Sequence, residues 1–584
     1  MGRCMDVNRA GEKRVSRRWF LAATGATVGA AGLASLRCGG NGNTTPPTPP
    51  GDDESPTPAA SASATRPVAG QQGGTLRYTG FVASDGVYDP HKTQAGPFYG
   101  HQALVFSRLL SYESQAEGTM TADLAEKMPE EPDALTYVFT LNKNARWQDR
   151  DPLNGRPVTA DDVRLSIERQ MSGDASFVRK AQWVNVDKIE VTDSSHITFR
   201  LKEPRAAMLN RFADVNAFIV APELTQDRRQ FTLDNQVGSG PFRWVDWSEG
   251  KFASVSRNAN WHGGGGRPFL NGITIKQPTN ASEVEGGFRT KELDVAFMGR
   301  PQADRLKKSV HGLLESTQGH SLFFGMRFFI KQFPYTDVRF RSAVSIALDR
   351  RKMLDEFFAG SGEVNPWISW PNKRWTLPQN ELTTLPGYRP GAAGRDQDMK
   401  EAKALLDAFK SASKVPDDIA LFVADDAEKS LHLGSLMKQQ LKESLDLNIT
   451  VYPMPIGDLS RRMLEGQAPW AAGPDNGWVD LDEWVYPYFH SEGTKNTFPL
   501  RDTDLDALIV GQRKELNEDK RRQIGYEIQR RLLNLNAGVN FVSERVVALA
   551  HPYVRNFPLD ISDGYQHRFA DCWIDQNDPS FRGR

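Results

Sequence analysis

Strands and amphipathic helices alternate along residues 73–584, and this alternation decides the class of fold. Apolar side chains at every second position of residues 135–141 have the period of a half-buried strand. Thr159 and Asp162 form a capping box, which predicts the start of a helix. The strand predicted at residues 449–452 lies between two helical stripes, Ala402, Leu405, Leu406 and Phe409 before it and Ile524, Ile528, Leu532 and Leu535 after it. This pattern is typical of an α/β protein, and its length predicts several lobes.

Composition excludes several other classes. Of 584 residues, 39% are hydrophobic, enough to bury a large core, which excludes disordered, collagen-like and disulfide-scaffold proteins. The 72 Lys and Arg residues balance 73 Asp and Glu residues, which argues against a nucleic-acid partner. Cys4 and Cys38 precede the folded stretch and Cys572 stands alone, so no disulfide is expected within that stretch. Because it adjoins Trp573, we expect Cys572 to be a packing residue rather than a catalyst.

The amino terminus has the pattern of an export signal. Arg17 and Arg18 precede an uncharged run at residues 21–36 that is too short to span a bilayer comfortably. The arginine pair, with Phe-Leu soon after it, resembles the twin-arginine export signal, and a chance pair before a weakly apolar helix is the alternative. We therefore predict a signal peptide over residues 1–37 and an exported protein of the cell envelope, in the periplasm or on the outer face of the cytoplasmic membrane.

Cys38 ends this uncharged region at a position that resembles the lipid-acceptor cysteine of bacterial lipoproteins. Arg37 stands where such proteins have a small residue, so ordinary cleavage near Ala34 stays open. Residues 38–72 are rich in Thr, Pro, Ser, Ala and Gly and have no apolar periodicity, which is typical of a tether. We predict a lipid anchor at Cys38 as the protein's only membrane contact.

Motifs that carry catalysis are absent from the sequence. It contains no G-x-S-x-G, H-E-x-x-H, C-x-x-C or phosphate-binding loop, and no two of its ten histidines are four residues apart. We therefore expect no metal, no cofactor and no enzymatic activity. The acids of residues 480–483 could form a carboxylate pair for glycoside hydrolysis or a Ca²⁺ site, but their spacing lacks the regular ligand pattern, which favours surface acids or polar pocket residues.

Several segments together resemble the bacterial extracellular solute-binding proteins of family 5, the peptide/nickel type of ABC importers. They occur in the family's order and spacing between about residues 73 and 540. The matching segments are Gly73-Gly74-Thr75-Leu76, Asp89-Pro90, Asp123-Leu124-Ala125-Glu126, residues 135–141, Ala145-Arg146-Trp147, residues 157–163, Gly238-Ser239-Gly240-Pro241-Phe242, Lys291-Glu292-Leu293-Asp294 and residues 334–339.

This resemblance implies a two-lobed, Venus-flytrap α/β body with an additional small α/β subdomain. Lobe I would comprise residues 73–118, 236–320 and 541–584, its subdomain residues 119–235, and lobe II residues 321–540. The implied function is that of a monomeric receptor, which captures a peptide or peptide-like solute and delivers it to an ABC permease with its ATPase. An exported hydrolase of glycosides or peptides is the alternative. The ligand itself stays open.

The resemblance also suggests where the pocket lies. In peptide-binding members, an aspartate in a Gly-Trp-x-x-Asp-like segment pairs with the free amine of the ligand. Aligning Asp480-Leu481-Asp482 with the family's Asp-Pro-Asp puts Gly477 at that position, and Asp475 reaches it only in a shifted register. Aromatic rings dominate what remains and suit apolar, aromatic or sugar faces, or peptides held by their backbone. The candidate site residues are Asp480, Trp470, Trp478, Trp367 and Trp370, with packing as the alternative role of about half of the tryptophans.

Overall fold

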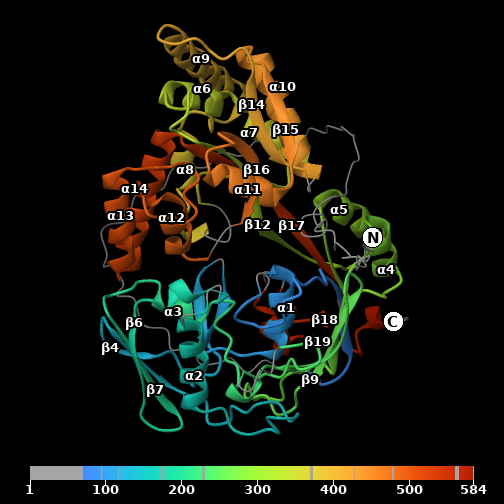
Figure 1. Ribbon diagram of the computed structural model, residues 1–584. Helices are drawn as coiled ribbons and strands as arrows, with labels where there is room; N and C mark the ends of the chain where they lie inside the picture. Colours follow the sequence, from blue (N-terminus) through green and yellow to red (C-terminus); the bar gives the residue numbers. More distant parts are fainter. Residues whose placement is uncertain are drawn as a thin grey trace, which may run out of the picture.

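The computed structural model describes residues 70–584 with short gaps (Figure 1). The predicted signal and tether, with Arg17, Arg18 and Cys38, lie outside the described residues, as do Trp370 and Trp478. No helix among the described residues is long and apolar enough to cross a membrane. The gaps are residues 94, 116, 173, 175, 178, 226–230, 369–372, 426–427, 477–478, 559–563 and 583–584.

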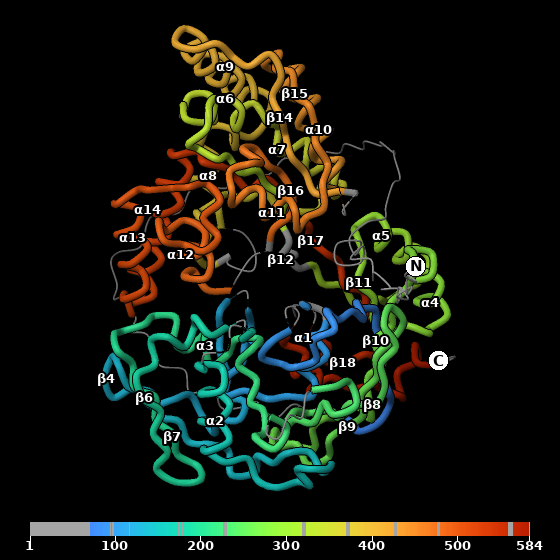
Figure 2. Tube along the Cα trace, in the orientation of Figure 1, coloured from blue at the N-terminus to red at the C-terminus, as the bar shows by residue number. Residues whose placement is uncertain are grey.

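Two long antiparallel strands connect two bodies, which we call lobe I and lobe II. β12 (Leu314–Phe328) pairs with β17 (Gly538–Ala550) from Leu314 opposite Ala550 in lobe I to Arg327 opposite Gly538 in lobe II. Their pairing shifts register between Gly319 and Phe323, midway along β12, and such irregularities locally increase the twist of a strand pair. Both strands belong to one eleven-stranded sheet, ordered β15-β14-β16-β12-β17-β11-β1-β10-β9-β8, with β13 beside β17. Figure 2 shows β12 and β17 where the two bodies meet.

Lobe I contains the chain's first strands and its last. β1 pairs in parallel with β10 and β11, whereas β17 returns antiparallel to β11 and completes this half of the sheet. Cys572 is fully buried in the same core as Leu76, as expected of a packing residue. The elements are β1 (Thr75–Thr79), α1 (Gly96–Val105), β2 (Leu110–Ser114), β3 (Thr119–Ala122), β8 (Phe242–Ser248), β9 (Phe252–Arg257), β10 (Gly272–Lys276), α4 (Ala281–Arg289), β11 (Val295–Met298), α5 (Arg300–Ser309), β18 (Val554–Arg555) and β19 (Trp573–Ile574).

A small unit packs on lobe I and shares its core. Its four-stranded sheet has the order β4-β5-β7-β6. The strand predicted at residues 135–141 is confirmed as β5, and the predicted capping box is confirmed, since Thr159 and Asp162 exchange hydrogen bonds at the start of α2. The elements are β4 (Glu130–Asp133), β5 (Thr136–Thr140), α2 (Ala160–Met171), the 3-10 turns η2 (Lys180–Gln182) and η3 (Pro222–Leu224), β6 (Val186–Val191), β7 (His196–Leu201) and α3 (Met208–Phe212).

Lobe II has its own hydrophobic cores. One lies between the sheet and the helices α6, α7, α9 and α10, and the other among α12, α13 and α14. The predicted strand at residues 449–452 is confirmed as part of β15. The elements are α6 (Val338–Ala347), α7 (Arg350–Phe358), β13 (Gly362–Val364), α8 (Gln379–Leu382), α9 (Gly391–Lys410), β14 (Ile419–Ala424), α10 (Glu428–Leu445), β15 (Ile449–Met454), α11 (Ile456–Leu464), β16 (Trp470–Asn476), α12 (Leu481–Phe489), α13 (Thr503–Lys514) and α14 (Glu518–Leu535).

The fold is thus α/β and two-lobed, with a separate core in each lobe. The lobe boundaries expected at residues 320 and 540 fall inside β12 and β17, where the chain passes from one lobe to the other. A hinge motion would bend these two strands and leave both cores intact.

Candidate functional site

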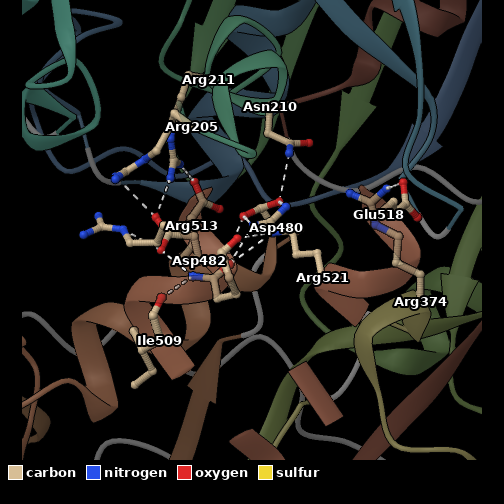
Figure 3. Close-up of polar contacts among 12 residues, drawn as sticks. Arg205, Asn210, Arg211, Arg374, Asp480, Asp482, Ile509, Arg513, Glu518 and Arg521 are labelled. Carbon is tan, nitrogen blue, oxygen red and sulfur yellow. Dashed lines mark hydrogen bonds and ion pairs between the residues drawn. The ribbon is translucent and has the colours of Figure 1, made fainter. Parts of the chain in front are cut away.

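Three acidic residues lie at the start of α12, where lobe II meets the small unit. Asp480 is the N-cap of this helix, and its Oδ1 accepts a hydrogen bond from the backbone N–H of Asp482 at 2.8 Å. Asp482 and Glu483 occupy the first helical turn. The positive end of the helix dipole favours carboxylates there, but three of them together also need nearby cations. Arginines from both lobes supply these cations (Figure 3).

Asp480 is completely buried and fully bonded. Arg521 of α14 donates to its two carboxylate oxygens at 2.9 and 2.7 Å, and Asn210 of α3 donates to Oδ2 at 2.9 Å. Burial acts to raise the pKa of Asp480, but the Arg521 guanidinium outweighs it and holds that pKa well below its usual range. Asp480 therefore stays ionised and bonded to protein groups, and its predicted contact with a solute stays a prediction.

Asp482 is the acid that arginines of both lobes approach. Arg205 and Arg211 of the small unit have guanidinium nitrogens 3.4 Å from its Oδ2. From lobe II, Gln512 donates to Oδ1 at 2.8 Å, and Arg513 forms an ion pair with the same oxygen at 2.9 Å. The side chains of Asp482 and Arg211 are each 3% exposed, so their attraction is weakly screened by solvent.

Glu483 takes its partners from the small unit. Gln182 donates to its Oε1 at 3.1 Å, and Arg211 donates to the same oxygen at shorter range. Burial outweighs the attraction of Arg211 and raises the pKa of Glu483 to about 7. Burial would lower the pKa of Arg211, but Glu483 and Asp482 hold it above its usual range. Arg211 thus remains charged, and Glu483 is the member of the pair that titrates.

Further contacts join the lobes around these acids. The backbone N–H of Ala206 donates to the carbonyl of Arg513 at 2.9 Å, and Val479 packs against the core of lobe I. Arg374 of lobe II lies directly against Gly118, where a side-chain Cβ would overlap its guanidinium. The two lobes therefore touch through these residues in this structure.

The predicted tryptophans that the structure describes lie inside lobe II. Trp470 is 1% exposed and stacks on Phe328, with ring centroids 5.8 Å apart. Trp367 is fully buried against Phe489 and Phe498. Both rings lie in packed cores of lobe II, and their part in binding stays a prediction. Trp370 and Trp478 lie outside the described residues, so their predicted roles also stand as predictions.

A polar cluster lies at the end of β16, and Asp475 is its one member that the sequence analysis considered. Arg327 lies 3.6 Å from a carboxylate oxygen of Asp475, and the Tyr488 hydroxyl lies 3.5 Å from the other. Lys495 donates to the Tyr488 hydroxyl at 3.4 Å. Burial lowers the pKa of both Arg327 and Lys495. Asp475 was visible in the sequence as an acid in a shifted register, whereas no local motif points to the two cations.

A shallow polar cavity of about 270 Å³ lies elsewhere, beside the two connecting strands. Its arginines, Arg300 and Arg545, are paired with Glu315 and Glu363, so the cavity offers an anion little uncompensated charge. Among the described residues, no group of three His, Cys, Asp or Glu side chains is arranged to hold a metal ion.

Two lobes with separate cores, joined by continuous strands and meeting at a polar interface, define a hinged binding protein of the periplasmic type. The family described as bacterial extracellular solute-binding proteins, family 5, matches residues 119–496, which is more than half of the chain. The chain belongs to this family.

Comparison with individual proteins agrees with this assignment. The glutathione-binding protein GsiB of Salmonella choleraesuis is 26% identical over 281 residues, which is 46% of this chain and 53% of GsiB. The oligopeptide-binding protein AppA of Bacillus subtilis is 23% identical over 343 residues, 55% of this chain and 61% of AppA. The chain thus aligns with little more than half the length of these relatives.

Solved structures share the fold over a longer stretch. The ABC transporter substrate-binding protein CtaP of Listeria monocytogenes superposes with a TM-score of 0.71 at 18% identity, covering 86% of this chain and all of CtaP. The Helicobacter pylori binding protein DppA, in complex with the peptide STSA, gives 0.68 at 17% identity and covers 86% of this chain and 99% of DppA.

Proposed function

We propose that this protein is the extracytoplasmic substrate-binding receptor of an ABC importer, which captures a peptide or peptide-like solute between its lobes and delivers it to the membrane permease and its ATPase. The observation that carries the proposal is the division into two lobes with separate cores, between which β12 and β17 are the only continuous elements in the described part of the chain. This division lets the lobes separate and close without unfolding either core.

The polar cluster beside Asp475 is the part of lobe II best suited to a zwitterionic solute. An acid, two cations and a tyrosine hydroxyl lie together there, and Asp475 is the acid that the family resemblance places next to a ligand amine in a shifted register. Trp478 and Trp370 are proposed to add apolar contacts. The relatives named for glutathione and oligopeptides support a short peptide as the class of solute.

The hydrolase alternative receives less support. A glycoside hydrolase needs a carboxylic acid with a raised pKa opposite a free carboxylate. Glu483 has a raised pKa, but the neighbouring Asp480 and Asp482 are both bonded to arginines and amide side chains, so neither is a free carboxylate opposite it. We further propose that the receptor is a monomer, exported by its twin-arginine signal and anchored through a lipid on Cys38.

Native mass spectrometry of the exported protein tests the function. An intact small solute retained at one molecule per chain is the expected result, and calorimetry with that solute gives its affinity. Asp475→Asn is then expected to weaken binding, with Glu381→Gln, which removes a surface ion pair to Arg530, as the matched control. A chain that retains nothing, but cleaves members of a peptide or oligosaccharide panel, would contradict the proposal.

A further inference from the structure

Around the start of α12, the lobes meet through an unequal division of charge, whereas an ion pair of the opposite sense joins Glu203 of the small unit to Lys514 of lobe II. Lobe II contributes the acids Asp480, Asp482 and Glu483, and the small unit contributes donors that approach them. We call these residues the clasp: Gln182, Arg205, Asn210 and Arg211 on the small unit, and Asp480, Asp482 and Glu483 on lobe II.

Separation of the lobes would affect these residues differently. Asp480 would keep Arg521, and Asp482 would keep Gln512 and Arg513, because all three partners belong to lobe II. In the described part of the chain, both hydrogen-bond donors to Glu483 belong to the small unit.

Arg211 is the centre of the clasp. The acceptors of its guanidinium are Asp482 and Glu483, both across the interface, and its side chain is 3% exposed. Opening would therefore exchange two buried, charge-assisted contacts for water, whereas the internal pairs of lobe II would survive.

Asn210 is likewise oriented toward an acid of lobe II. The hydroxyl of Tyr112, in lobe I, donates to its Oδ1, which turns the Nδ2 group toward Asp480. Lobe I thus holds the side chain of Asn210 in place before the lobes meet. Less conformational entropy is then lost when the lobes close.

We propose that the small unit is the closing clasp of the receptor and that Arg211 and Asn210 are positioning residues, which set the ratio of closed to open protein while touching no solute. The proposal builds on the proposed function, since closure is how such a receptor retains its solute. A protein that is partly closed beforehand gains affinity and releases its solute more slowly, because less of the binding energy is spent on closure.

The lobe separation of the solute-free protein tests the clasp directly. Spin labels at Lys188→Cys on β6 and Lys520→Cys on α14 report the distance across the interface by double electron–electron resonance. The full chain is used with Cys4→Ser and Cys38→Ser, and Cys572 stays because it is buried. We expect a closed population in this background. Arg211→Met should raise the open-to-closed ratio by about 10- to 100-fold, because buried acids lose a cation.

Two further variants separate the clasp from general damage. Arg211→Lys keeps the charge and should restore part of the closed population. Arg530→Met removes a two-point pair with Glu381 inside lobe II and should leave the distances unchanged. The clasp is refuted if Arg211→Met leaves the distance distribution of a folded protein unchanged, or if the unsubstituted background is entirely open. Either result would leave the proposed function standing, because the measurement involves no solute.

Discussion

Replacing Asp480 with asparagine is expected to destabilise lobe II, because Asp480 is a buried anion paired with Arg521 inside that lobe. The change removes the charge that Arg521 faces, and Arg521 is itself 4% exposed. Breaking a buried ion pair from one side costs about 3–5 kcal/mol. Asparagine is as good an N-cap as aspartate, so the start of α12 is preserved and the loss reports the charge alone. For a lobe of this size, that loss lowers the melting temperature by about 6–20 °C.

Thermal unfolding followed by tryptophan fluorescence measures this loss, since lobe II contains buried Trp367, Trp470 and Trp484. Asp519→Asn is the matched control, because Asp519 is 84% exposed and pairs with Arg522 inside the same helix. It should leave the melting temperature unchanged. If Asp480→Asn melts like the unsubstituted protein but no longer retains its solute, the structural reading is wrong and Asp480 contacts the solute.

The remaining predictions concern export, anchoring and pH. Cys38→Ala should move the protein from membranes to the soluble fraction in cell fractionation, and an already soluble protein that begins near residue 35 would contradict the anchor. Arg17→Lys with Arg18→Lys should block export, which immunoblotting of the periplasm measures; unchanged export would indicate another route. The raised pKa of Glu483 contributes stability that is complete below its ordinary value of 4.5 and is lost as the pH rises through about 7. In Glu483→Gln, the fall in melting temperature across that range should be smaller, and an unchanged profile would assign it to other groups.

Local elements were predictable from the sequence because their signals are local. The alternation at residues 135–141 and the Thr159–Asp162 box each report on neighbours a few residues apart, and both are confirmed as β5 and α2. The family resemblance supplied the two-lobed arrangement, which periodicity alone left as a multi-lobed body.

The clasp was not predictable in this way. Asn210 and Asp480 are 270 residues apart, so the sequence around either residue does not indicate the contact between them. The acids at residues 480–483 were expected to be surface acids or polar pocket residues, and the surface alternative is wrong for Asp480 and Asp482, which are buried. Arginines occur throughout the chain, so the sequence does not select Arg211 as their partner. Likewise, a tryptophan in the sequence indicates a large, apolar side chain but not where it lies. The burial of Trp470 and Trp367 in cores depends on how the distant parts of the chain pack.

The pairing of β11 with β17 determines when lobe I can be completed during synthesis of the chain. Until residues 538–550 leave the ribosome, β11 has an unpaired edge and lobe I lacks one strand of its sheet. Lobe II, which lies between β12 and β17, is by then almost complete. Lobe I, whose first strands are made first, is therefore completed last, and the exposed edge of β11 is available to chaperones while lobe II is synthesised. A chain truncated before residue 538 should bind such holdases stably, whereas one that ends after β19 should be released.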